Sequence, residues 1–205
     1  MRHKRPNDGD RGSKVVESQL RIIGGRLRGR TVHYNGDAGL RPMKDRVRES
    51  VFNLVGPDVV GKTVIDLFAG TGAMAIESLS RGADSAICIE RRFPNARTIT
   101  DTAITLGIGE KLTVIPGDAF VWVKRHLPTT APPWLVFCCP PYEFYATRLD
   151  DMLQLIETTY RQSPLNSVLV VESDERFAVD QLPFSNVWDT RQYPPAVISV
   201  ARKRE

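Results

Sequence analysis

The spacing of apolar and polar residues predicts alternating strands and helices in the larger, C-terminal part of the chain. Downstream of Gly61, short apolar runs alternate with longer stretches in which apolar residues recur at helical spacing. Such alternation is typical of β-α-β units built around a parallel sheet. We expect strands over residues 63–67, 85–90, 111–115, 134–138 and 166–172, and helices over 73–81, 93–106, 118–126 and 145–161.

The last part of the chain has a different pattern. Two β-rich runs between about residues 184 and 202 are separated by Pro194 and Pro195, a connection too short for a crossover helix. These runs predict an antiparallel hairpin at the edge of the sheet. The fold class that follows is α/β, with a parallel sheet extended by that hairpin.

The N-terminal part lacks the β-α-β pattern. Residues 1–18 are polar without periodicity and predict a disordered tail. Residues 20–34 mix apolar and basic side chains around Gly24, Gly25 and Gly29, which predicts a small basic hairpin. We therefore expect three parts: a tail over 1–18, a basic hairpin and helix over 19–56, and the main domain over 57–205.

An amphipathic helix is predicted between the hairpin and the main domain, over residues 44–55. Its apolar positions recur at helical spacing, which predicts one buried face and one face in solvent. The buried face would carry Val47, Val51, Phe52 and Val55. The solvent face would carry Arg46, Arg48 and Glu49.

Charge is distributed unevenly along the 205 residues, whose net charge is +4. The first 50 residues hold 13 Lys and Arg against 6 Asp and Glu, whereas the remainder holds 15 against 18. Clustered Lys and Arg gain free energy by displacing counterions from nucleic acid, so the basic segment suggests an arm that contacts phosphates. A solubilising tail would have the same charge, and charge alone does not distinguish the two.

The remaining composition argues against several classes of protein. No run approaches the roughly eighteen apolar residues that span a bilayer, and the basic N-terminus is not followed by the apolar core of a secretory signal. We therefore expect a cytoplasmic location and no membrane partner. Cys88, Cys138 and Cys139 offer neither a disulfide framework nor C-x-x-C spacing, and the three histidines are scattered, so no metal site is expected.

A glycine-rich turn follows the first strand of the main domain. Gly70, Gly72 and Ala75 form a G-x-G-x-x-A spacing, and Glu90 ends the next strand 20 residues after Gly70. The glycines allow a ligand to approach the backbone at the carboxyl edge of the sheet, where Glu90 can accept both hydroxyls of a ribose. This predicts an adenosine-containing cofactor, and the spacing fits NAD almost as well as S-adenosylmethionine.

Asp66 favours S-adenosylmethionine. A carboxylate directly before the turn repels the pyrophosphate of NAD and suits the cationic amino-acid end of S-adenosylmethionine. Asp118, after the third strand, could accept the adenine amino group or could only cap the next helix. An NAD-dependent oxidoreductase stays as an alternative, against which Asp66 and the lack of a hydride-transfer acid both count.

The fourth strand of the main domain ends in Cys139, Pro140, Pro141 and Tyr142. The prolines fix the backbone, so nearby carbonyls can point at a ligand while Tyr142 presents a flat aromatic face. This suits a purine held out of its stack with its amino group directed at a methyl donor. The alternative is a packed tyrosine in an ordinary Pro-rich turn, and the position at the cofactor edge favours the binding role.

These motifs together resemble the RsmD family of bacterial 16S ribosomal RNA methyltransferases. The matching segments are 20–30, 40–49 and 66–83, in that order, and the resemblance extends to the C-terminal hairpin. It implies a Rossmann-like class I methyltransferase with a mostly parallel seven-stranded sheet, which uses S-adenosylmethionine to methylate the N2 amine of one guanine. The implied partner is 16S ribosomal RNA or a small-subunit assembly intermediate, and the expected state is a monomer.

The expected site residues fall into three groups. The catalytic turn is Cys139, Pro140, Pro141 and Tyr142. The cofactor site comprises Arg41, Asp66, Phe68, Ala69, Gly70, Thr71, Gly72, Glu90, Arg91, Asp118 and Ala119. The RNA phosphates would be contacted by Arg21, Arg26, Arg28, Arg30, Arg46 and Arg48.

Two positions depart from the pattern of the family. Cys139 stands where the family has an Asp that accepts a hydrogen bond from the target amine, and a thiol is a much weaker acceptor. Losing such a contact typically costs a factor of about 10² to 10³ in rate, which backbone carbonyls of Cys139 and Pro140 could offset in part. Met43 replaces a Thr near Arg41. An RNA-binding or ribosome-binding module that has lost turnover through Cys139 is therefore the alternative function.

Overall fold

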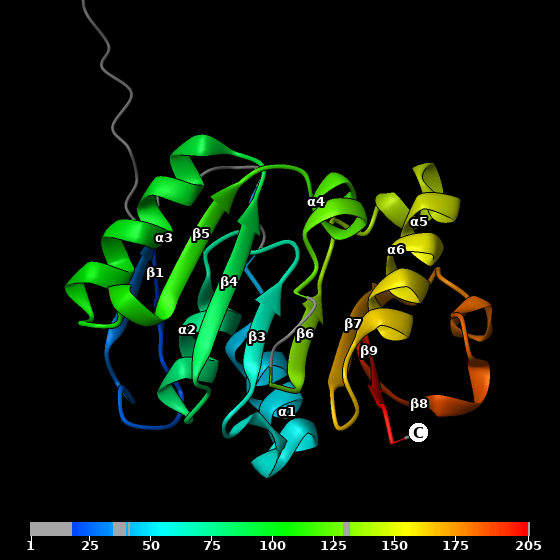
Figure 1. Ribbon diagram of the computed structural model, residues 1–205, viewed down its shortest axis with the longest axis horizontal. Helices are drawn as coiled ribbons and strands as arrows, with labels where there is room; N and C mark the ends of the chain where they lie inside the picture. Colours follow the sequence, from blue (N-terminus) through cyan, green and yellow to red (C-terminus); the bar gives the residue numbers. More distant parts are fainter. Residues whose placement is uncertain (1–17, 35–39, 41, 129–131, 205) are drawn as a thin grey trace, which may run out of the picture.

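The core of the protein is a seven-stranded sheet in the order β5-β4-β3-β6-β7-β9-β8 (Figure 1). The computed structural model describes residues 18–34, 40, 42–128 and 132–204. The five strands from β3 to β7 are parallel, and β9 lies antiparallel between β7 and β8. Their bounds are β3 Thr63–Asp66, β4 Ser85–Glu90, β5 Leu112–Pro116, β6 Trp134–Cys138, β7 Val168–Asp174, β8 Trp188–Tyr193 and β9 Ala196–Arg202. The expected α/β fold, with a mostly parallel seven-stranded sheet and an antiparallel C-terminal hairpin, is confirmed.

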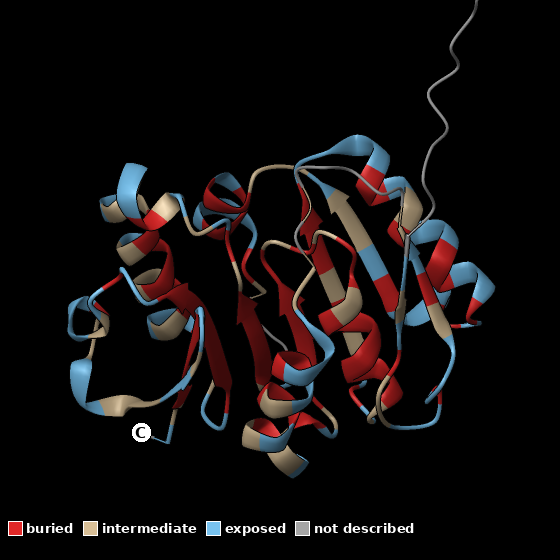
Figure 2. Cartoon of the chain, turned by 180° about the vertical axis from the view of Figure 1, so that it is seen from behind, coloured by how far each residue is buried: buried red, intermediate tan, exposed pale blue. Residues whose placement is uncertain are grey.

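The central strands are apolar because helices cover them on both faces. Val64 of β3 lies opposite Ala86 of β4 and Leu135 of β6, and all three are buried. Figure 2 shows these strands as the most buried part of the chain. Continuous apolar runs, rather than strictly alternating ones, are typical of parallel strands buried in this way.

Helices form one layer on each face of the sheet. The helices α1 (Asp45–Val55), α2 (Ala73–Ser80) and α3 (Phe93–Thr105) pack in one core cluster, which also contains Val64 and Phe137. The helices α4 (Ala119–His126), α5 (Phe144–Thr147) and α6 (Leu149–Gln162) pack in a second cluster on the other face. The predicted helices other than 145–161 agree with these bounds to within a residue.

Two predicted elements differ from the structure. The helix expected over 145–161 is two helices, α5 and α6, separated at Arg148, whose guanidinium lies 3.8 Å from the centre of the Phe120 ring and is bonded to Asp151. The strand expected over 166–172 covers Val168–Asp174 instead. Asn166 has a φ of 65° and its amide donates to the Lys203 carbonyl at 2.7 Å, so the chain turns there before the strand begins.

The N-terminal hairpin consists of β1 (Ser18–Arg21) and β2 (Thr31–Tyr34), paired antiparallel as predicted. Its turn is bonded to the C-terminal end of α2. The Arg26 amide donates to the Ser80 carbonyl at 2.8 Å, and the buried Glu77 carboxylate accepts the amides of Ile23 and Gly24. Helix α2 is eight residues long, so this turn lies about 12 Å along the helix from its N-terminal end.

The predicted N-terminal tail lies almost entirely outside the described residues, and β1 begins at Ser18, the last residue assigned to it. Hairpin residues Ile22, Leu27 and Val32 belong to the same core cluster as α1 and the sheet. Within the part of the chain that the structure describes, every helix is too short or too polar to cross a membrane.

Candidate active site

Four acidic or sulfur-bearing side chains gather where the parallel strands end. Asp66 ends β3, Glu90 ends β4, Cys139 directly follows β6 and Glu172 lies near the end of β7. Carboxyl ends of parallel strands meet at one edge of the sheet, which is the usual ligand edge of open α/β folds. Side chains alternate along a strand, so Asp66 shares the face of Val64 and Glu172 shares the face of Val170, toward α1, α2 and α3.

The glycine-rich turn connects β3 to α2 as the spacing predicts. Gly70 has a φ of 54° and Gly72 a φ of 73°, in the left-handed region that glycine adopts without strain. A Cβ at Gly72 would lie 2.8 Å from Cγ2 of Ile99, so a larger residue does not fit there. Helix α2 begins directly after Gly72 and directs its first amides toward the turn. Ala69 and Thr71 of the turn are buried, and Phe68 packs edge to face on Phe120.

Asp66 is 2% exposed, and burial raises the pKa of its carboxyl group to about 7. The nearby Glu90 carboxylate raises this pKa further, whereas hydrogen bonds from the backbone amides of Phe68 and Ala75 act in the opposite direction. A buried carboxyl with this pKa gains free energy when a cation lies beside it, because the cation favours its ionised form. Asp66 therefore fits the cationic end of a ligand.

Glu90 connects its strand to the glycine turn. One carboxylate oxygen accepts the Gly70 amide at 2.8 Å, and the other accepts the Arg92 amide at 2.8 Å. The side chain is buried, so these bonds hold it in one orientation. Each carboxylate oxygen has a second lone pair, which leaves acceptor capacity for the hydroxyls of a ribose.

Asp118 caps helix α4. Its Oδ1 accepts the amides of Phe120 at 2.8 Å and Val121 at 3.2 Å, so the predicted helix cap is present. Both bonds go to one oxygen, so the cap is compatible with a contact from Oδ2. Ala119, the other residue expected here, is buried at the start of α4.

The Pro-Pro-Tyr turn is held by an acid that sequence reasoning missed. The Tyr142 hydroxyl donates to Oε1 of Glu172 at 2.7 Å, and the Tyr145 hydroxyl donates to the Glu172 carbonyl at 2.9 Å. Pro140 is buried, Pro141 is exposed and Tyr142 is half-buried. In the sequence, the one feature that could have pointed to Glu172 is its place as a single acid at the end of the apolar run that forms β7.

The Cys139 thiol lies beside Glu172 and is hydrogen-bonded to it. Burial, the Glu172 carboxylate and Asp66 raise the pKa of Cys139, so the group is a neutral thiol. Burial also raises the pKa of Glu172, and the hydrogen bonds from Tyr142 and Cys139 oppose that shift. Together, Cys139 and Glu172 provide a buried acceptor close to position 139, where the family pattern predicts the carboxylate of an Asp.

The arginines expected to contact RNA are not equivalent. Arg48 is wrong as a phosphate contact, because it is 1% exposed and donates to the Arg21 carbonyl and to Asp45, with its Nε 4.0 Å from Glu77. Helical periodicity placed it on the solvent face, but it packs under the hairpin. Arg41 lies outside the described residues. The exposed ones are Arg21, Arg26, Arg28, Arg30, Arg46 and, in the expected cofactor set, Arg91.

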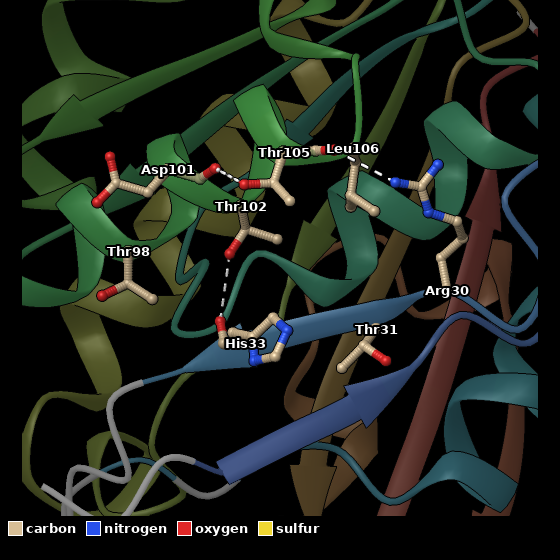
Figure 3. Close-up of a pocket in the computed structure, with 8 residues that line it drawn as sticks. All are labelled: Arg30, Thr31, His33, Thr98, Asp101, Thr102, Thr105 and Leu106. Carbon is tan, nitrogen blue, oxygen red and sulfur yellow. Dashed lines mark hydrogen bonds between the residues drawn. The ribbon is translucent and has the colours of Figure 1, made fainter.

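A cavity of about 510 Å³ lies between β2 and the C-terminal half of α3 (Figure 3). The Thr102 hydroxyl donates to the His33 carbonyl at 3.4 Å, and Arg30 donates to the Thr105 carbonyl at 3.3 Å across it. None of the residues that line the cavity belongs to the carboxylate edge. These bonds fasten the hairpin to α3, so we assign the cavity to that junction.

The strand order, the antiparallel last hairpin and the acid-flanked glycine turn define an α/β methyltransferase fold. A solved structure with this fold is the Thermus thermophilus 16S rRNA N2 G1207 methyltransferase RsmC, in complex with AdoMet and guanosine. Its TM-score is 0.72 at 17% identity, over 92% of this chain and 50% of that one. The solved Escherichia coli protein yhhF has a TM-score of 0.74 at 28% identity, over 92% of this chain and 100% of that one.

Sequence comparison identifies the family. The family model described as Conserved hypothetical protein 95 matches residues 20–200. The chain is also 35% identical over 154 residues to Ribosomal RNA small subunit methyltransferase D of Escherichia coli strain K12, which covers 75% of this chain and 72% of that protein. The chain therefore belongs to this family, the RsmD family.

Proposed function

We propose that this protein transfers a methyl group from S-adenosylmethionine to the exocyclic N2 amine of a guanine in small-subunit ribosomal RNA. The observation that carries the proposal is the placement of two buried carboxylates, Asp66 and Glu90, at the glycine turn, with the half-buried Tyr142 at the same edge of the sheet. The name of the Escherichia coli relative, a small-subunit ribosomal RNA methyltransferase, supports the same substrate class.

The residues at the glycine turn fit S-adenosylmethionine. In the proposed site, Asp66 pairs with the cationic amino-acid end, Glu90 accepts the ribose hydroxyls and Oδ2 of Asp118 accepts the adenine amine. Phe68, Ala69, Gly70, Thr71, Gly72, Arg91 and Ala119 would line the same site, together with Arg41. When bound, the cofactor supplies an electrophilic methyl group on a sulfonium.

The Pro-Pro-Tyr turn fits the target base. Tyr142 would stack on the guanine, and the carbonyls of Cys139 and Pro140 lie on the rigid backbone that orients it. Rate acceleration then comes mainly from proximity and alignment of the amine with the methyl group. Exposed arginines of the hairpin and α1 would contact RNA phosphates: Arg21, Arg26, Arg28, Arg30 and Arg46.

Cys139 also supports a second candidate, an RNA-binding or ribosome-binding module that keeps the cofactor fold with little or no turnover. A thiol is a poor acceptor for the target amine, so a chain that depended on residue 139 for this contact would methylate slowly. The two candidates share the cofactor site and the basic surface. They differ in whether a methyl group reaches the RNA.

Labelled S-adenosylmethionine and small-subunit RNA from cells that lack this gene separate these candidates. The proposed enzyme transfers label to one guanine N2, which mass mapping of the RNA locates, and Tyr142→Ala abolishes the transfer while S-adenosylhomocysteine still binds. Tight RNA binding without label supports the module. A calorimetric comparison of NAD with S-adenosylhomocysteine tests the cofactor itself, and preferential binding of NAD would refute both candidates.

A further inference from the structure

Glu172 contacts both residues expected to meet the target base, yet the function proposed above gives it no role. Its side chain is 9% exposed at the carboxyl end of β7. Tyr142 donates a hydrogen bond to Oε1 of Glu172 at 2.7 Å, and the Cys139 thiol is bonded to the same carboxylate. The acid is therefore placed between the stacking platform and the position where the family pattern has an Asp.

The hydrogen-bonding capacity of this carboxylate exceeds what its protein partners use. An ionised carboxylate has about four acceptor positions, and a thiol is a weak donor. An exocyclic amine is a stronger donor than a thiol, so exchange of Cys139 for a substrate amine at Glu172 is favourable. Tyr142 can keep its own bond to Oε1 during this exchange.

We propose that Glu172, rather than residue 139, accepts the hydrogen bond of the guanine N2 amine and afterwards takes its proton. The proposal rests on the proposed function and names the group that replaces the expected Asp. The amine nitrogen forms a bond to the methyl carbon as the carbon–sulfur bond breaks, and the electron pair of that bond stays on sulfur as a neutral thioether. The extra proton of the methylated amine passes to the Glu172 carboxylate and from there to solvent.

The groups around Glu172 determine how the rate of methyl transfer should depend on pH. Cys139 and Tyr142 face it from the turn after β6, Tyr145 faces it from α5, and Asp174 lies further along β7. Burial raises the pKa of Glu172, and only the ionised form can accept both the hydrogen bond and the proton. We therefore expect kcat to increase with pH through that pKa and then to level off.

Steady-state kinetics on Glu172→Gln tests the proposal. Glutamine keeps an acceptor for Tyr142 but presents an amide donor to the amine, so kcat should fall by about 10² to 10³. The KM for S-adenosylmethionine should stay unchanged, and the pH dependence of kcat should flatten. Adding Cys139→Asp to Glu172→Gln should recover at least about tenfold in kcat, because it returns a carboxylate to the amine. Glu175→Gln, on the exposed loop after β7, is the matched control and should behave as wild type.

A binding measurement separates failure of this proposal from failure of the proposed function. Inosine lacks the N2 amine of guanosine, so we compare a single-stranded oligouridylate carrying one central guanosine with the same oligonucleotide carrying inosine. With S-adenosylhomocysteine present, the wild type should prefer guanosine by about tenfold in anisotropy titrations, and Glu172→Gln should lose the preference.

Each combination of results has a defined meaning. A Glu172-dependent preference in a protein that methylates no RNA would overturn the proposed function and the proton transfer to Glu172, and would support only the hydrogen bond between Glu172 and the guanine amine. Wild-type kcat in Glu172→Gln would overturn that role and leave the function standing. A loss of kcat that Cys139→Asp does not recover, with the guanosine preference intact, would show that Glu172 only holds Tyr142. A wild type with neither methyl transfer nor preference would overturn both.

Discussion

Protonation of Asp66 should control the affinity for the cofactor near neutral pH. Burial and Glu90 raise the pKa of this carboxyl group to about 7, so about a tenth of the molecules carry the ionised form at pH 6 and about nine tenths carry it at pH 8. A ligand whose cationic end requires that charge should bind about tenfold more tightly at pH 8 than at pH 6. Below pH 6 the affinity should fall by about another tenfold per pH unit.

The raised pKa of Asp66 also affects the stability of the ligand-free protein. The folded pKa of Asp66 lies above its unfolded value of 3.8, so its contribution to stability is fully present below about pH 4 and is lost as the pH rises through about 7. The loss is at most roughly 4 kcal/mol. Asp66→Asn should therefore make the ligand-free protein more stable than wild type at pH 8, while weakening its binding of S-adenosylhomocysteine.

Isothermal titration calorimetry of S-adenosylhomocysteine between pH 5 and pH 9, in buffers of different ionisation enthalpy, checks the binding prediction. Wild type should release close to one proton on binding at pH 6 and almost none above pH 8, and Asp66→Asn should lose this dependence. Asp84→Asn, on an exposed position before β4, is the matched control. The reasoning would be refuted if the affinity of Asp66→Asn varied with pH as steeply as that of wild type, or if the affinity of wild type did not vary with pH.

Three further predictions concern the scaffold and the RNA surface. Glu77→Ala removes the acceptor of two hairpin amides and leaves buried positive charge, so urea unfolding should show a loss of about 3 to 5 kcal/mol; a loss under about 1 kcal/mol would contradict this. Gly72→Ala places a Cβ about 2.8 Å from Cγ2 of Ile99 and should cost about 1 to 3 kcal/mol in the same assay; the cost should be smaller in an Ile99→Ala background, which lacks both Cγ atoms that the new Cβ would meet. Arg46→Glu, on the exposed face of α1, should weaken RNA binding and reduce the slope of log affinity against log salt concentration by about 1 or more. Arg125→Glu on α4 should have neither effect, and equal effects of the two substitutions would argue against a specific basic surface.

The sequence was sufficient to predict the elements of the sheet and the glycine turn because their signals are local. Apolar runs and glycines determine where a strand ends and which backbone conformations are open, and neither depends on distant residues. Arg48 was misplaced for the opposite reason. Its burial depends on Glu77 and on the Arg21 carbonyl, which are distant along the chain. The helical spacing of apolar residues cannot predict a contact with either partner.

The sequence did not identify Glu172 as a site residue because its contacts come from two other parts of the chain, the turn after β6 and helix α5. In the sequence it is one acid at the end of an apolar run, and the predicted strand ended at that residue instead of continuing to Asp174. Only the folded chain shows that Tyr142, 30 residues earlier, donates to it and that Cys139 lies beside it. The position of the residue in the sheet, rather than its local sequence, makes it a candidate for the reaction.

The electrostatics of this edge explain how a thiol can occupy position 139. The Cys139 sulfur lies close enough to Glu172 and Asp66 for both to raise its pKa, so a carboxylate there would be a third buried negative charge. Two carboxylates about 5 Å apart at an effective dielectric constant of about 20 repel by roughly 3 kcal/mol. A neutral thiol avoids that repulsion and donates a weak hydrogen bond that a substrate amine can displace. In the role proposed above, the Glu172 carboxylate beside this thiol is the acceptor for the amine.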